Sequence, residues 1–174
     1  MDDNQNDHYR LLSAAQLALQ QGDFKKAMAG FKSVYEQNPG DLRAAVGLAL
    51  TIALSGETQR GLDMLNILLG NFPSEAIIPD AIGLILADQN RYREAETWFR
   101  KAIRLSGFRA STACNLGEAL NELGRFDDAA AMFKRCLRQN PDDVSARYHL
   151  GLCQLLSGDY EAGWQGFHLR NRVA

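Results

Sequence analysis

The sequence is short of the residues that cross-link small domains, bind metals or interrupt helices. Of its 174 residues, three are cysteines, three are histidines and four are prolines. Cys114, Cys136 and Cys153 are odd in number and lack the spacing of a disulfide framework or a zinc site, so we expect each to fill a small apolar position. No apolar run approaches the roughly 20 residues of a membrane span.

An excess of one charge is also missing. The chain carries 19 Lys and Arg against 21 Asp and Glu, a net charge of −2, which gives no reason to expect a nucleic acid or an anionic membrane as partner. Residues 1–7 are acidic and polar rather than basic and then apolar. We interpret them as a disordered lead-in rather than a signal peptide, and we expect a cytoplasmic protein.

Residues arranged for catalysis are absent as well. His8, His149 and His168 stand apart from any Cys, Asp or Glu at metal-ligand or triad spacing. The glycines do not form a phosphate-binding motif. We therefore expect no catalytic residues, no metal and no cofactor, and we predict that this chain is not an enzyme.

One short pattern returns at a fixed interval along the chain. Gly124-Arg-Phe-Asp is repeated with variation from Gly22, Gly56, Asn90 and Gly158, so that each copy begins 34 residues after the last. A period of this length is typical of a stacked repeat array. The pattern divides the chain into five units, which are residues 8–41, 42–75, 76–109, 110–143 and 144–174.

Each unit contains two segments of helical length. In the fourth unit, Leu116 and Leu120 lie on one apolar stripe, and Gly124 supplies the left-handed conformation that commonly ends a helix. A second apolar stripe includes Phe133, and Pro141 ends that segment because it cannot continue the helix. The units are therefore predicted to be pairs of antiparallel helices in an all-α fold.

The period and the residues at fixed places resemble the tetratricopeptide repeat (TPR). Its pattern runs Trp-x2-Leu-Gly-x2-Tyr, then Ala-x3-Phe, then Pro. Leu116-Gly117, Ala129, Phe133 and Pro141 match it, whereas Ala113 holds the tryptophan place. The sequence departs from the pattern where Gly61 and Gly163 replace the alanine and where Pro79 is expected to shorten or delay a helix. The resemblance implies a right-handed solenoid of five helix-turn-helix repeats with a concave groove.

A second stripe on the first helix of each unit is the candidate binding surface. Two interpretations stay open: these residues are buried between repeats, or they line a groove for a protein or peptide. Asp80 and Glu118 would repel a carboxylate, so a partner with basic and apolar residues is favoured. The stripe consists of Leu12, Gln16, Leu19, Val46, Leu50, Asp80, Leu84, Cys114, Glu118, Asn121, Tyr148 and Leu152.

The last unit carries a further resemblance. Gly158-Asp159-Tyr160, Gly163-Trp164 and Arg170 are similar to the closing repeat of bacterial TPR-containing protein glycosyltransferases, although Phe167 and His168 depart from it. This resemblance implies an acceptor-recognition region of such an enzyme, with flagellin as one acceptor. The alternative is a self-contained scaffold that self-associates through a C-terminal face of Tyr160, Trp164 and Phe167.

Overall fold

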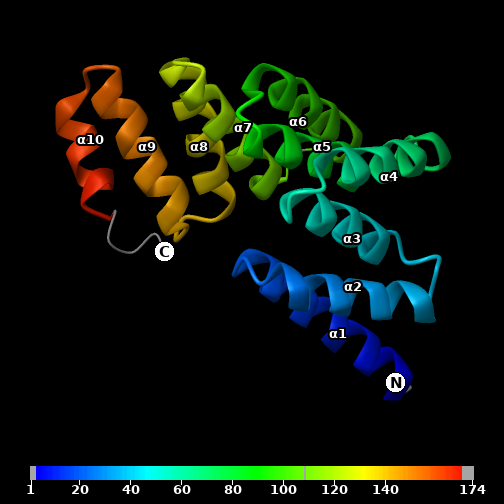
Figure 1. Ribbon diagram of the computed structural model, residues 1–174. Coiled ribbons are helices and arrows are strands. Elements are labelled where there is room, and N and C mark those ends of the chain that lie inside the picture. The colour runs from blue at the N-terminus through cyan, green and yellow to red at the C-terminus, as the bar shows by residue number, and fades with distance from the viewer. Residues whose placement is uncertain (1–2, 108, 170–174) are drawn as a thin grey trace. The chain divides into compact units, whose positions relative to one another are not determined.

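The structure is a computed structural model that describes residues 3–107 and 109–169. Within these residues it contains ten α-helices and no β-strand, which confirms the predicted all-α fold (Figure 1). In chain order the helices are α1 (Asp3–Gln20), α2 (Phe24–Gln37), α3 (Leu42–Leu54), α4 (Thr58–Asn71), α5 (Ile77–Asp88), α6 (Tyr92–Ser106), α7 (Ala110–Glu122), α8 (Phe126–Gln139), α9 (Val144–Leu156) and α10 (Tyr160–Phe167). The first of them begins inside the polar stretch 1–7.

The chain forms two compact units, Met1–Ile85 and Leu86–Ala174. In the first unit α1 packs against α2, α2 against α3, and α3 against α4. In the second unit α6 packs against α7, α7 against α8, α8 against α9, and α9 against α10. Each helix of these series thus packs on the next one in the chain, as expected for helix-turn-helix repeats.

The predicted turns have the backbone conformation that the sequence pattern indicated. Gly22, Gly56, Gly124 and Gly158 all have positive φ, and Gly124 has a φ of 73°. In the third repeat Asn90 occupies the equivalent place with a φ of 58°. Asparagine is one of the few other residues that tolerate a positive φ. The turn can therefore form in the third repeat without glycine.

A capping side chain lies at the start of α9, and a proline lies in the first turn of α5. Asp143 accepts a hydrogen bond from the Ala146 amide at 2.9 Å and so caps α9. Pro79 lies in the first turn of α5, where its missing N–H costs little. That helix has 12 residues against 13 for each of α3, α7 and α9, so the expected shortening is a single residue.

Small residues mark the places where paired helices approach most closely. A Cβ added to Gly117 of α7 would lie 2.8 Å from Cζ of Phe133, which is completely buried on α8. A Cβ on Gly61 would lie 2.5 Å from the Ala49 carbonyl oxygen. Backbone this close leaves no room for a methyl group, which explains why Gly61 stands where the repeat pattern usually has alanine.

Gly61 and Gly70 on the same helix provide a matched test of this packing. Gly61→Ala is expected to lower the free energy of unfolding by about 1–3 kcal/mol, because the new methyl group overpacks the contact with α3. Gly70→Ala should instead raise it by about 0.5–1 kcal/mol, since nothing lies within 4 Å of its added Cβ and alanine favours the helix. Urea unfolding followed by circular dichroism measures both. Equal stability of the two variants would contradict the close approach.

Asp41 links the first repeat to the second. Its Oδ2 lies 2.7 Å from Nε2 of His8 on α1, and its Oδ1 accepts from the Arg43 and Ala44 amides at the start of α3. Burial alone would raise the pKa of this carboxyl, but the hydrogen bonds from His8 and these amides, with the charge of Arg43, hold the pKa below its ordinary value.

A depressed pKa means that ionised Asp41 stabilises the fold above the pKa of the unfolded chain, about 3.9. This stabilisation is lost as the pH falls through the lower, folded pKa. Asp41→Asn is therefore expected to cost about 1–3 kcal/mol at pH 7, and the deficit should shrink on acidification. Asp23→Asn, at the exposed cap of α2, should change stability by less than about 0.5 kcal/mol. A deficit for Asp41→Asn that persists unchanged at pH 3 would rule out a charge effect.

Candidate protein-binding surfaces

The first helices of the last two repeats, α7 and α9, lie next to each other in the second unit. Cys114, Glu118 and Asn121 come from α7, and Tyr148 and Leu152 come from α9. Glu118 is exposed and the other four are half-buried. We call these five residues the first-helix face of the second unit. They combine accessible apolar surface with one carboxylate.

Contacts between the helices hold this face in place. Nε2 of His149 on α9 lies 3.6 Å from Oε1 of Glu118 on α7. The His149 ring stacks on Phe133 with 5.4 Å between ring centroids, and the Tyr148 ring meets His149 edge-on at 5.1 Å. The thiol of Cys153 donates to Oδ1 of Asn121 at 3.6 Å. Glu118 and Asn121 are therefore positioned by the following repeat.

His149 was not among the residues predicted from the sequence. Sequence reasoning treated it as an isolated histidine, because its two partners, Glu118 and Phe133, belong to the preceding repeat. The only available signal was its place beside Tyr148 on a first helix. The structure adds it to the candidate site as the residue that faces the Glu118 carboxylate.

The pKa of the Glu118 carboxyl reflects opposing influences. Burial raises its pKa above the ordinary value, the charge of His149 lowers it, and the neighbouring Glu122 raises it again. With 49% of its side chain exposed, Glu118 is accessible to a partner while it remains incompletely solvated. A lysine or arginine seated here would offset both the burial and the repulsion from Glu122.

In the first unit the predicted stripe divides into core and surface. Leu12 and Val46 are only 3% exposed, and Leu12 packs in a cluster with Ala15, Ala18 and Phe31. We correct the prediction for these two residues and assign them to the core. Gln16 is exposed, whereas Leu19, Leu50, Asp80 and Leu84 are half-buried and remain candidates for contact. The stripe therefore divides into residues buried in the core and residues that keep accessible surface.

The C-terminal face is accessible and joins the first-helix face. Tyr160 is 66% exposed and Trp164 is 50% exposed. Phe167 is half-buried, with its ring stacked on Tyr148 at 5.9 Å and edge-on to Trp164 at 5.6 Å. A Cβ on Gly163 would lie 2.9 Å from the Gly151 carbonyl oxygen, so this glycine lets α10 approach α9 closely. Trp164 consequently lies at the surface rather than filling the core.

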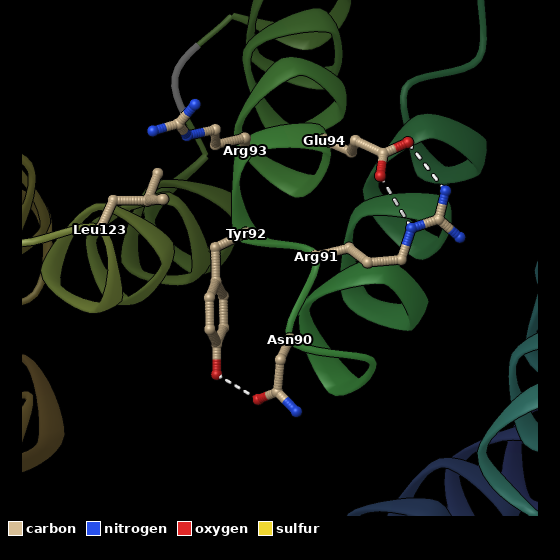
Figure 2. A pocket seen from close by; sticks show the side chains of 6 residues that line it. All are labelled: Asn90, Arg91, Tyr92, Arg93, Glu94 and Leu123. Carbon is tan, nitrogen blue, oxygen red and sulfur yellow. Dashed lines mark hydrogen bonds and ion pairs between the residues drawn. The ribbon is translucent and has the colours of Figure 1, made fainter.

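A shallow cavity of about 290 Å³ lies at the turn before α6 (Figure 2). Its polar side chains largely satisfy one another. Arg91 donates two hydrogen bonds of 2.8 Å to Glu94, and the Tyr92 hydroxyl donates to Oδ1 of Asn90 at 2.7 Å. Arg93 and Leu123 complete the lining. The cavity contains no nucleophile paired with a base, and we assign it no chemistry.

No group of three or more His, Cys, Asp or Glu side chains in residues 3–107 and 109–169 is arranged to hold a metal ion. Over the same residues, each helix is too short or too polar to cross a bilayer.

Comparison with known proteins identifies the repeat. Residues 12–76 and 114–163 match one family model described as tetratricopeptide repeat, and residues 80–106 match another with the same description. Tetratricopeptide repeat protein 21B of Xenopus laevis is 28% identical over 128 residues, which is 73% of this chain and 10% of that protein. Tetratricopeptide repeat protein 34 of Mus musculus is 24% identical over 83% of this chain and 31% of its own length. The chain thus spans a minor part of these relatives.

Solved structures confirm the fold. Pseudomonas aeruginosa PilF superposes with a TM-score of 0.74 over 99% of this chain and 79% of its own, at 19% identity. MamA superposes with a TM-score of 0.67 over 89% of this chain and 91% of its own, also at 19% identity. At these identities the likeness establishes a TPR-like solenoid and nothing about partners.

Proposed function

The chain belongs to the tetratricopeptide repeat family, and on that premise we propose that it is a scaffold that binds another protein through its first helices. Stacked repeats expose one helix of each pair along a continuous face, and this family indicates protein binding rather than catalysis. The observation that carries the proposal is Glu118, a half-exposed carboxylate of raised pKa set among half-buried Tyr148 and Leu152.

The chemistry of this face favours a partner segment with basic and apolar residues. A basic side chain would reach Glu118, and apolar side chains would cover Leu152 and the Tyr148 ring. In the first unit, half-buried Leu50 and Leu84 offer further apolar contact. Burial of such residues contributes about 25 cal/mol per Å² of apolar surface, while the carboxylate selects the sign of the partner's charge.

A finer assignment rests on the resemblance of residues 158–170. We propose that the chain is the acceptor-recognition region of a bacterial protein glycosyltransferase, with flagellin as a test acceptor. Purified flagellin should bind the chain and should lose binding to Leu152→Asp, since a buried carboxylate in an apolar contact is costly. Equal binding of flagellin and an unrelated acidic protein would remove this assignment and leave the scaffold proposal intact.

The second candidate function is self-association through the C-terminal face. It is favoured by the exposure of Leu156, Tyr160 and Trp164, at 51%, 66% and 50%, because exposed apolar patches commonly mark interfaces. Light scattering after size exclusion should then show a dimer that Trp164→Ala dissociates. A monomer at all concentrations would eliminate this candidate.

The pH dependence of binding tests the role of Glu118. Peptides selected from a displayed random library on the full chain should be enriched in Lys or Arg next to apolar residues. Their affinity should fall as the pH falls through the raised pKa of Glu118, because protonation removes the negative charge. Glu118→Gln should weaken binding at pH 7 by about fivefold to tenfold and flatten the pH profile.

Glu36→Gln is the matched control, because Glu36 is an exposed glutamate on α2, outside the stripe. It should leave the affinity within about twofold. Selection of acidic peptides, or the same loss in both variants, would refute a cation site at Glu118.

A further inference from the structure

The second helices of the third and fourth repeats, α6 and α8, share a concentration of positive charge. From Thr97 to Ala110, and again from Ala129 to Pro141, every charged residue is basic. We define the basic ladder as the six of these residues that recur in pairs exactly one repeat apart, namely Arg100, Lys101 and Arg104 on α6 and Lys134, Arg135 and Arg138 on α8. The chain has 19 Lys and Arg in all, so nearly a third of them lie on these two half-helices.

The ladder lies on the accessible side of both helices. Ala95, Phe99 and Ala102 form the buried side of α6, and the helical repeat of 3.6 residues places Arg100 and Arg104 on the opposite side. Arg100, Arg104 and all three ladder residues of α8 are exposed. Lys101 is half-buried, with its ammonium 4.9 Å from the centroid of the Trp98 ring.

An ion-pair bridge ties the two helices together. Oε1 of Glu96 on α6 accepts from Arg125, directly before α8, at 2.7 Å and from Arg100 at 2.9 Å. A side-chain ion pair thus links the residue before α8 to α6. The acidic residues of both helices lie in their first halves, as Glu94 and Glu96 do on α6, which leaves the second halves with positive charge alone.

Helix stability alone does not account for the ladder. A cation in the last turn interacts favourably with the helix dipole, and this explains Arg104 and Arg138. Lys134 and Arg135 precede the last turn. The other second helices with described last turns, α2, α4 and α10, have no basic residue there. Lys134 and Arg135 lie four and three residues before Arg138, spacings at which like charges repel each other, so helix stability does not explain these two residues.

We propose that the basic ladder binds an acidic polypeptide segment, rich in Asp and Glu, of a partner protein. Four of the six residues are arginines, whose planar guanidinium groups pair with carboxylates through two hydrogen bonds. Two positively charged rows on neighbouring repeats fit an extended chain with several carboxylates. This surface lies on second helices and is separate from the first-helix face. The proposal can therefore be tested independently of the function proposed above.

Nucleic acids and membranes fit the ladder less well. Single-stranded nucleic acid is held by aromatic side chains that stack on its bases, and Trp98 is already covered by Lys101. A membrane-surface helix inserts an apolar side into the lipid, whereas the apolar side of α6 is buried in the protein. Carboxylates on a polypeptide require neither feature.

The experiment uses the full chain and a fluorescein-labelled peptide of about 12 residues, in which two of every three residues are Glu. An extended chain spans about 3.3 Å per residue, so this peptide is long enough to reach across two helices. Fluorescence anisotropy at low salt gives its Kd for the wild type and for the variants. Arg104→Gln with Arg138→Gln should weaken binding by about tenfold, since each exposed pair contributes modestly. Lys25→Gln with Lys26→Gln, two exposed cations on α2, should change the Kd by less than about twofold.

The competing ligands are an oligothymidylate of equal charge and vesicles that contain an anionic phospholipid. The proposal is supported if the peptide binds more tightly than both and only the ladder variant loses affinity. It is overturned if the peptide does not bind, if both double variants lose affinity equally, or if the oligonucleotide or the vesicles bind more tightly. Circular dichroism of each variant establishes that its helices are retained.

Discussion

The close approach of paired helices is the constraint on which the rest of the structure depends. Where Gly117 meets Phe133, and where Gly61 meets the Ala49 carbonyl, a methyl group has no space. Fully buried Phe31, Phe99 and Phe133 occupy equivalent places in the first, third and fourth repeats, where the second repeat has the buried Leu65. Helix pairs that pack this closely allow little variation on their facing sides, whereas the outward sides of the helices are free to vary. Differences between repeats are therefore expected mainly among surface residues.

The outward sides of the first helices carry different side chains from the outward sides of the second helices. The first helices α7 and α9 combine half-buried apolar side chains with the carboxylate of Glu118, whereas α6 and α8 carry rows of arginine and lysine. The net charge of −2 gives no indication that basic residues are concentrated on α6 and α8. Under the two proposals above, surfaces of opposite sign on the two kinds of helix would bind partners of opposite charge, and the chain would bring two proteins together.

The sequence predicted most of the fold because the same local signals for helices and turns recur in successive repeats. The positive φ at Gly124 and the one-residue shortening of α5, which has Pro79 in its first turn, both followed from local chemistry. The site was less predictable because it depends on packing between repeats. Leu12 and Val46 share an apolar stripe with Leu50, yet only Leu50 keeps accessible surface. The pairing of His149 with Glu118 joins residues on different repeats, for which no local pattern exists.

Site-specific photocrosslinking tests the central claim, that first helices form the protein-binding face, most directly. A photoreactive amino acid would replace Leu152 on α9 in the full chain, expressed in its native cells, and in a separate variant it would replace Ile67, which is 66% exposed on α4. The account predicts a discrete crosslinked protein from position 152 that is absent from position 67 and is reduced in yield when Glu118→Gln is added. Equal crosslinking from both positions, or none from position 152, would contradict it.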